Sequence, residues 1–140
     1  MSDNIEWRHS DEWKCERSGF TVLVRRHGTK AYEMVDGKLQ YTDVIENKWC
    51  LYAYIYPKHE LFSKFDASSD INCDAARFFD WHGGCTFLRM HMSGDDCTSV
   101  QIGCDYNHLD DDRYLEMSNF DEASDSVFAD AARLISVLEG

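Results

Sequence analysis

Short apolar runs that are rich in β-branched and aromatic residues predict the strands of this protein. Residues 20–24, FTVLV, form one such run, and the sequence HGT at residues 27–29 then favours a turn. The most apolar run covers residues 49–56, WCLYAYIY, and stops at Pro57. Because proline cannot donate a hydrogen bond within a sheet, this run is expected to end there, and its length predicts a central strand.

Two pairs of strands are expected to be joined by tight turns. Asp36 and Gly37 form an Asp-Gly pair, which favours the left-handed turn of a two-residue hairpin. The sequence SGDD at residues 93–96 is a second turn signal. The flanking segments are residues 32–35 and 39–42 at the first turn, and residues 84–92 and 97–103 at the second. Both patterns predict antiparallel pairing.

The C-terminal segment has the spacing of an amphipathic helix. Its apolar stripe consists of Val127, Ala131, Leu134 and Leu138. Acidic residues precede the stripe, at the positive end of the helix dipole, where they stabilise a helix. A helical turn is also expected around residues 74–79. Together the elements predict an α+β fold, a mostly antiparallel sheet with the C-terminal helix packed on one face.

Length and composition fit one folded domain. The chain has 140 residues, of which 14% are aromatic, and it contains no linker-like stretch. Residues 1–18 are polar apart from two tryptophans, and they are expected to form an N-terminal arm or a short helix. Residues 19–140 are expected to form a single domain.

The charge of the chain is unevenly distributed. The net charge is −12, and residues 61–140 carry sixteen acidic and five basic residues, a net of −11. Such a surface repels phosphate backbones, so direct binding to DNA or RNA is disfavoured. It would be attracted to a basic surface on another protein. The alternative is a solvated face that only aids solubility.

The cysteines and the N-terminus bear on the compartment. Six cysteines are present without any C-x-x-C pair, and the start of the chain has neither the basic nor the apolar region of a signal peptide. Reduced thiols within the core are therefore expected. No apolar run approaches the ~20 residues of a membrane span. These features predict a cytoplasmic protein that does not bind membranes.

Two short segments could carry chemistry. His82 directly precedes two glycines and a predicted strand, in the sequence WHGGCT. Asp105, His108 and Asp110 follow another predicted strand. With His82 they would supply two imidazoles and two carboxylates, a set that suits Zn²⁺ or Mn²⁺ and the activation of water. Alternatively, Asp105 could orient His108 as a general base without a metal.

Binding and structural roles compete with catalysis at the same segments. Trp81 and Tyr106 could stack on a nucleotide, and the acidic run Asp110, Asp111 and Asp112 could contact a basic partner. The structural alternative is a loop that binds nothing, in which aspartate side chains cap backbone amides. His59, which follows Pro57, could complete the polar cluster or simply lie on the surface.

These segments resemble a family of small proteins encoded by bacteriophages and prophages. The matching pieces, in the same order, are VRRH at residues 24–27, WCLYAY at 49–54 with Pro57 and His59, HGGCTF at 82–87, IGCDYNHLDD at 102–111, and the helix at 127–138. The chain departs from the pattern at residues 51–53 and 60–61, which weakens the match at His59 more than at His82. The family has no assigned activity.

The resemblance implies a phage accessory protein with a shared polar cluster. Small acidic phage proteins often inhibit a host protein, and inhibitors of defence nucleases, including anti-CRISPR proteins, use acidic faces that imitate nucleic acid. The first hypothesis is therefore an acidic protein that binds and inhibits a host defence protein with a basic surface. The alternatives are a small metal-assisted hydrolase and a nucleotide-binding protein, both using His82, Asp105, His108 and Asp110.

Overall fold

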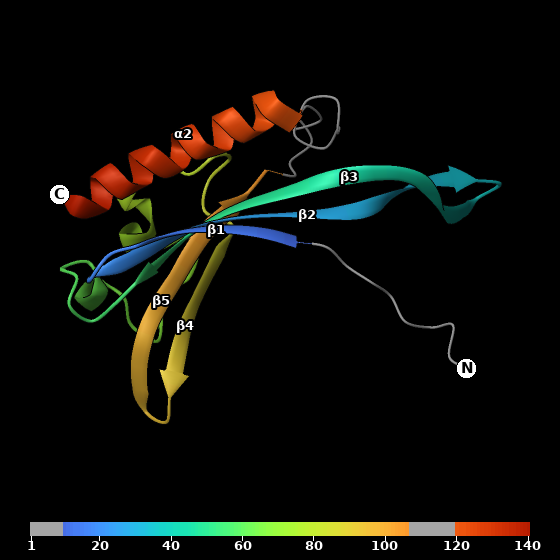
Figure 1. Ribbon diagram of the computed structural model, residues 1–140. Helices are drawn as coiled ribbons and strands as arrows, with labels where there is room; N and C mark the ends of the chain where they lie inside the picture. The colour runs from blue at the N-terminus through green and yellow to red at the C-terminus, as the bar shows by residue number, and fades with distance from the viewer. Residues whose placement is uncertain (1–9, 107–119) are drawn as a thin grey trace, which may run out of the picture.

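The computed structural model of the protein describes residues 10–106 and 120–140, and its strands form one antiparallel sheet (Figure 1). Along the chain the elements are β1 (Ser10–Glu16), β2 (Phe20–Val35), β3 (Lys38–Ile55), two 3₁₀ turns (Phe62–Lys64 and Asp74–Phe78), β4 (Phe87–Ser93), β5 (Asp96–Asp105) and α2 (Phe120–Glu139). The strand order is β1-β2-β3-β5-β4. The predicted α+β fold, with the helix against a mostly antiparallel sheet, is confirmed.

Helix α2 covers one face of the sheet, above β2 and β3 (Figure 1). Its predicted stripe of Val127, Ala131, Leu134 and Leu138 is buried. It joins one core with the alternating β3 side chains Trp49, Leu51, Ala53 and Ile55, all of which are fully buried. Burial of each large aliphatic side chain contributes roughly 1.5–3 kcal/mol. The helix therefore forms because its stripe completes this core, and β3 is the central strand that its apolar run predicts.

Strands β2 and β3 form a long hairpin that extends beyond the rest of the sheet (Figure 1). Its turn contains Asp36 and Gly37 at φ values of 52° and 77°, which confirms the predicted left-handed hairpin turn. The turn expected at residues 27–29 is wrong. His27 and Gly28 pair with Lys48 and Asn47, and the strand runs straight through them. Pairing with β3 overrides the local turn preference.

Residues 10–16 form the edge strand β1 and not a short helix. Its Trp13 stacks on Trp49 with ring centroids 6.0 Å apart, and it meets Phe128 of α2 edge to face at 5.2 Å. Asp11 accepts two hydrogen bonds from the guanidinium of Arg26, at 3.0 and 2.8 Å. These contacts hold a mostly polar strand in place.

The sheet face opposite α2 is covered by its own large side chains. The rings of Tyr52 and Phe87 meet edge to face at 5.4 Å, and Tyr54 stacks on His91 at 5.9 Å. The His91 Nε2 atom lies 2.7 Å from Oε1 of Gln101, whose side chain is buried. Burial raises the pKa of the Tyr52 and Tyr54 hydroxyls above the ordinary value of 10.0. This face therefore combines aromatic packing with buried polar groups.

The segment between β3 and β4, residues 56–86, fills the core beside α2. Its Phe65, Ala76, Phe79 and Trp81 are buried and belong to the same core. The expected helical turn near residues 74–79 is present as the 3₁₀ turn Asp74–Phe78. In the part of the chain that the structure describes, no helix is both long and apolar enough to cross a membrane.

Candidate functional site

The His82 ring stacks on Tyr106, at the end of β5. The ring centroids are 4.4 Å apart and the planes differ by 21°. Gly83 and Gly84, at φ values of 66° and 90°, form the turn that presents His82, and the Gly84 amide donates to the Trp81 carbonyl at 2.9 Å. Both φ values lie in the left-handed region, which explains the paired glycines. A tight turn therefore leads from Trp81 toward β4.

Tyr106 connects this histidine to helix α2. Its side chain is fully buried, and its hydroxyl donates to Asp130 Oδ2 at 2.6 Å. Asp130 also forms an ion pair with Arg133, one helical turn further on. Stacking, a hydrogen bond and an ion pair thus connect three segments that are distant in sequence, through His82, Tyr106, Asp130 and Arg133. These contacts fix the end of β5 against the helix.

Asp105 lies on the other side of β5. Its register partner is Cys50, and Thr86 Oγ1 donates to its Oδ2 at 3.5 Å. Successive strand side chains point to opposite faces, so Asp105 faces away from α2 while Tyr106 faces it. The sheet therefore separates the Asp105 carboxylate from the His82 ring, although the two residues lie near the same strand end.

Cys104 has a buried thiol between these groups. Burial raises its pKa from 9.0 to about 12, and a hydrogen bond with the His82 backbone opposes the rise. Cys50, on the opposite face, also has a raised pKa, mainly because of burial. Protonated thiols are poor nucleophiles. The two cysteines that flank the polar cluster are thus suited to packing, as the sequence predicts. All six cysteines are free.

The remaining predicted site residues divide into two groups. His108, Asp110, Asp111 and Asp112 lie outside the described residues. Within residues 10–106 and 120–140, no three His, Cys, Asp or Glu side chains are grouped so that they could hold a metal ion. Trp81 is described, and it is buried between Phe78 and Phe79 with its Nε1 donating to the Ala76 carbonyl at 3.0 Å.

The burial of Trp81 and Tyr106 has a consequence for ligand binding. Their exposed fractions are 4% and 0%, so neither ring offers a free face to a nucleotide. Stacking on a nucleotide would therefore require both rings to become accessible first. Their hydrophobic rings contribute to the core, as large aromatic side chains commonly do.

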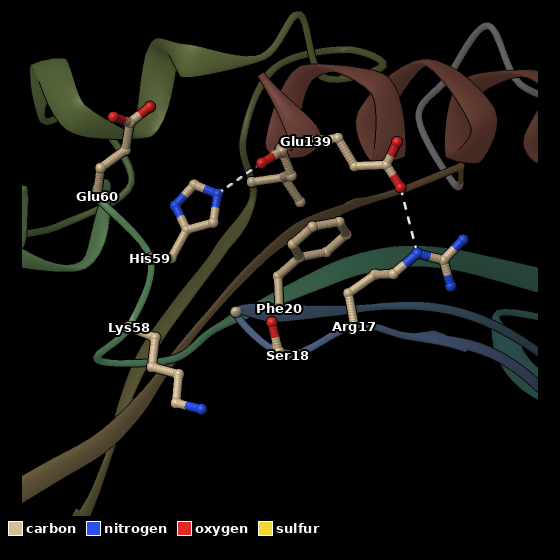
Figure 2. Close-up of a pocket in the computed structure, with 9 residues that line it drawn as sticks. Arg17, Ser18, Phe20, Lys58, His59, Glu60 and Glu139 are labelled. Atoms are coloured by element: carbon tan, nitrogen blue, oxygen red, sulfur yellow. Dashed lines mark hydrogen bonds and ion pairs between the residues drawn. The ribbon is translucent and has the colours of Figure 1, made fainter.

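His59 takes part in a different arrangement. Its Nε2 donates to the Leu138 carbonyl at 2.7 Å, and its Nδ1 accepts from the Leu61 amide at 3.1 Å (Figure 2). Its ring also meets Phe20 edge to face at 5.9 Å. His59 therefore ties the segment after β3 to the C-terminal end of α2. It lies apart from the His82 cluster, and it is more than a surface residue because both of its ring nitrogens form hydrogen bonds.

A shallow pocket of about 550 Å³ surrounds this histidine (Figure 2). Its lining consists of Arg17, Ser18, Gly19, Phe20, Lys58, His59, Glu60, Leu138 and Glu139. Arg17 Nε pairs with Glu139 Oε1 at 3.2 Å, while Lys58 and Glu60 extend away from the His59 ring in different directions (Figure 2). Because the charged groups diverge, the pocket lacks the convergent polar groups of a ligand site.

Exposed carboxylates are numerous on the described surface. Those that form no ion pair within the described residues are Glu16, Glu33, Asp36, Glu60, Asp66, Asp70, Asp80, Asp95, Asp96 and Asp125. Most of them belong to the segment between β3 and β4 and to the turn between β4 and β5. Most of the described acidic residues in the C-terminal part of the chain are thus exposed to solvent.

Sequence reasoning missed two features of the surface and the cluster. The tip of the β2–β3 hairpin exposes Met34, Leu39 and Tyr41, although alternate apolar positions beside an Asp-Gly turn were a usable signal. Asp130, the acceptor for Tyr106, carried no signal, because an aspartate on a helix is usually solvated. Searches against protein-family models, curated proteins and solved structures give no match for this chain.

Proposed function

We propose that this protein acts by binding, and that it occupies a basic surface on a partner protein. The observation that carries the proposal is the set of ten exposed carboxylates that form no ion pair within the described residues, on a chain of net charge −12. Fixed negative charge accelerates encounter with a positive surface and disfavours negatively charged partners. A rigid, acidic domain can thereby compete with a nucleic acid for the same basic groove.

The acidic residues fall into groups that can be tested separately. The crossover group consists of Glu60, Asp66, Asp70 and Asp80, between β3 and β4. The turn group consists of Asp95 and of Asp96, the first residue of β5. All six side chains are exposed, so they can meet a partner without prior unfolding. The group that contacts the partner should dominate the affinity, while the other group contributes only long-range attraction.

The partner class is suggested by the sequence resemblance to phage-encoded proteins. A phage product with an acidic surface is suited to block a host protein whose function depends on binding nucleic acid. Defence nucleases, including CRISPR effectors, are such proteins. We therefore propose a host defence protein with a nucleic-acid groove as the partner, and inhibition by occupation of that groove.

Binding should first be tested with the whole chain as bait against bacterial lysate, at about 50 mM and about 500 mM salt. Captured proteins are then purified, and their affinity for the chain is measured across this range. We expect a basic, nucleic-acid-binding protein whose affinity falls at least about tenfold with salt. An uncharged partner, or affinity that is unaffected by salt, would contradict the proposal.

Matched amide variants locate the contact. Asp70→Asn with Asp80→Asn, and Asp95→Asn with Asp96→Asn, each remove two charges from a different place. One pair should weaken binding far more than the other, because close charges contribute more than distant ones. Equal small effects from both pairs would mean that only the total charge matters, which contradicts a defined binding face.

A further inference from the structure

The part of the chain that the structure describes contains three methionines, and their surroundings differ. Met34 lies near the tip of the β2–β3 hairpin and Met92 near the end of β4, with exposed fractions of 65% and 55%. Met90 is half-buried and packs against the core. A thioether sulfur is oxidised most readily where an oxidant in solvent can reach it, so exposure alone ranks these three side chains.

Met34 occupies a position where oxidation changes a local contact and leaves the core untouched. It is the register partner of Leu39 across β2 and β3, and neither residue belongs to the core. The hairpin extends beyond the rest of the sheet at this end (Figure 1). Apolar cross-strand pairs stabilise a two-stranded ribbon. A polar sulfoxide in place of the thioether therefore weakens the pair at the tip.

Cysteine thiols compete with methionines for the same oxidants, and three of the cysteines are poor competitors. Burial raises the pKa of the Cys50, Cys85 and Cys104 thiols above the ordinary value of 9.0. Because a thiol reacts through its thiolate form, these three react slowly near neutral pH. An exposed thioether has no such requirement, since its sulfur lone pair is available at any pH.

We propose that Met34 is a site of reversible oxidation by peroxides, and that its oxidation loosens the hairpin tip while the domain stays folded. The thioether sulfur attacks one oxygen of hydrogen peroxide, the O–O bond breaks, and an S–O bond forms. The sulfur is oxidised to a sulfoxide, and the peroxide is reduced to water. A methionine sulfoxide reductase reverses the step, with two thiols that become a disulfide and with release of water.

Treatment of the full chain with hydrogen peroxide, followed by peptide mass spectrometry, measures the oxidation rate of each methionine. We expect Met34 to gain an oxygen atom at least about threefold faster than Met90, because its side chain is more exposed. Hydrogen exchange of the oxidised protein should be faster at residues 33–40 and unchanged at residues 49–55 of β3. Treatment with the reductase should restore the original exchange, and circular dichroism should be the same before and after oxidation.

Two matched variants assign the change at the tip to one sulfur atom. Met34→Leu keeps an apolar side chain of similar size without a sulfur atom, so peroxide should leave exchange at residues 33–40 unaltered. Met92→Leu removes the other exposed thioether, and peroxide should loosen its hairpin tip as it does in the wild type. Both substitutions are at exposed positions outside the core, so both variants should fold.

Each other outcome overturns the inference. Oxidation of Met90 as fast as Met34 would mean that exposure does not select the site. A hairpin tip that exchanges at the same rate after complete oxidation of Met34, or that still responds in Met34→Leu, would remove its local effect. Loss of the circular dichroism signal in oxidised Met92→Leu would contradict a domain that stays folded. Binding to a basic partner is measured on unoxidised protein, so the proposed function is tested separately.

Discussion

Tyr52 lies directly across from Gly103, and its ring occupies the space that a side chain at position 103 would need. The two residues are register partners in β3 and β5. A Cβ atom on Gly103 would lie 2.5 Å from the Tyr52 ring and 2.2 Å from the Leu51 carbonyl oxygen. Phe87 of β4 pairs with the same glycine and meets the Tyr52 ring edge to face. Because Gly103 has no side chain, the rings of Tyr52 and Phe87 can pack closely against the backbone of β5.

Replacing Gly103 with alanine should destabilise the protein strongly. The methyl group would overlap backbone as well as side-chain atoms, so a rotamer change cannot relieve the clash. We expect a loss of about 3 kcal/mol in the free energy of unfolding, the upper part of the range for overpacking. Urea denaturation followed by circular dichroism measures this loss.

Gly19→Ala is the matched control. A Cβ atom there would meet only the His59 side chain and backbone at 3.5 Å or more, which is ordinary contact. We expect a change within about 1 kcal/mol, because the lower entropy of the unfolded chain offsets small losses. Equal effects of the two substitutions would show that the sheet at Gly103 is more adaptable than these distances imply.

The hydrogen bond from Tyr106 to Asp130 should contribute more than a neutral one. Tyr106→Phe removes a donor at 2.6 Å from a largely buried carboxylate, and a cost of about 1.5–3 kcal/mol is expected. Tyr56→Phe removes a 2.8 Å bond to the Thr21 hydroxyl, for which about 0.5–1.5 kcal/mol is expected. Both changes remove one oxygen atom, so denaturation of the two variants compares charged and neutral acceptors. A smaller loss for Tyr106→Phe would contradict this account.

His59→Ala should loosen the C-terminal end of α2. The substitution removes the donor to the Leu138 carbonyl and the acceptor for the Leu61 amide, at a cost of about 1–3 kcal/mol. Hydrogen exchange by mass spectrometry should show faster exchange near residues 134–139 and little change at β5. Lys58→Ala, an exposed neighbour, is expected to leave exchange unaltered. Uniform acceleration over the whole chain would mean that His59 has no local role.

Stability should fall at alkaline pH. The folded-state pKa of Cys104 is about 12, above its ordinary value of 9.0, because burial favours the neutral thiol. Cys104 therefore ionises above pH 9.0 in the unfolded chain but only near pH 12 in the folded protein. Its contribution to the free energy of unfolding is fully present below pH 9.0 and is lost as the pH rises toward about 12. Raised pKa values at Cys50, Cys85 and Tyr52 act in the same direction. Urea midpoints between about pH 7 and about pH 11 test this decline, and Cys104→Ala should make it shallower.

A metal shared by His82 and Asp105 is not expected. The pleat of β5 places Asp105 on the face opposite Tyr106, on which His82 stacks. We expect protein purified without chelator and its His82→Ala variant to contain the same amount of zinc or manganese. Mass spectrometry of the metals measures both. One equivalent that disappears in His82→Ala and in Asp105→Ala would overturn this prediction and favour the hydrolase.

The local pattern of the chain was enough to predict its elements where local energetics dominate. Asp36 and Gly37 adopt positive φ in the hairpin, because such a turn needs left-handed residues and these two tolerate it. The buried stripe of α2 follows from its 3.6-residue spacing. The same pattern failed at residues 27–29 and in β1, where pairing between distant segments supplies the hydrogen bonds.

The candidate site could be predicted only in part. His82 stacks on Tyr106 at the end of β5, whereas Asp105 pairs with Cys50 on the opposite face. The sequence by itself determined that these polar residues lie next to strands, and that the C-terminal part is strongly acidic. Tertiary structure decided which of them share a face, because the register that sets Cys50 against Asp105 assigns each side chain to one side of the sheet. A shift of one residue would reverse every assignment, and nothing local encodes that register.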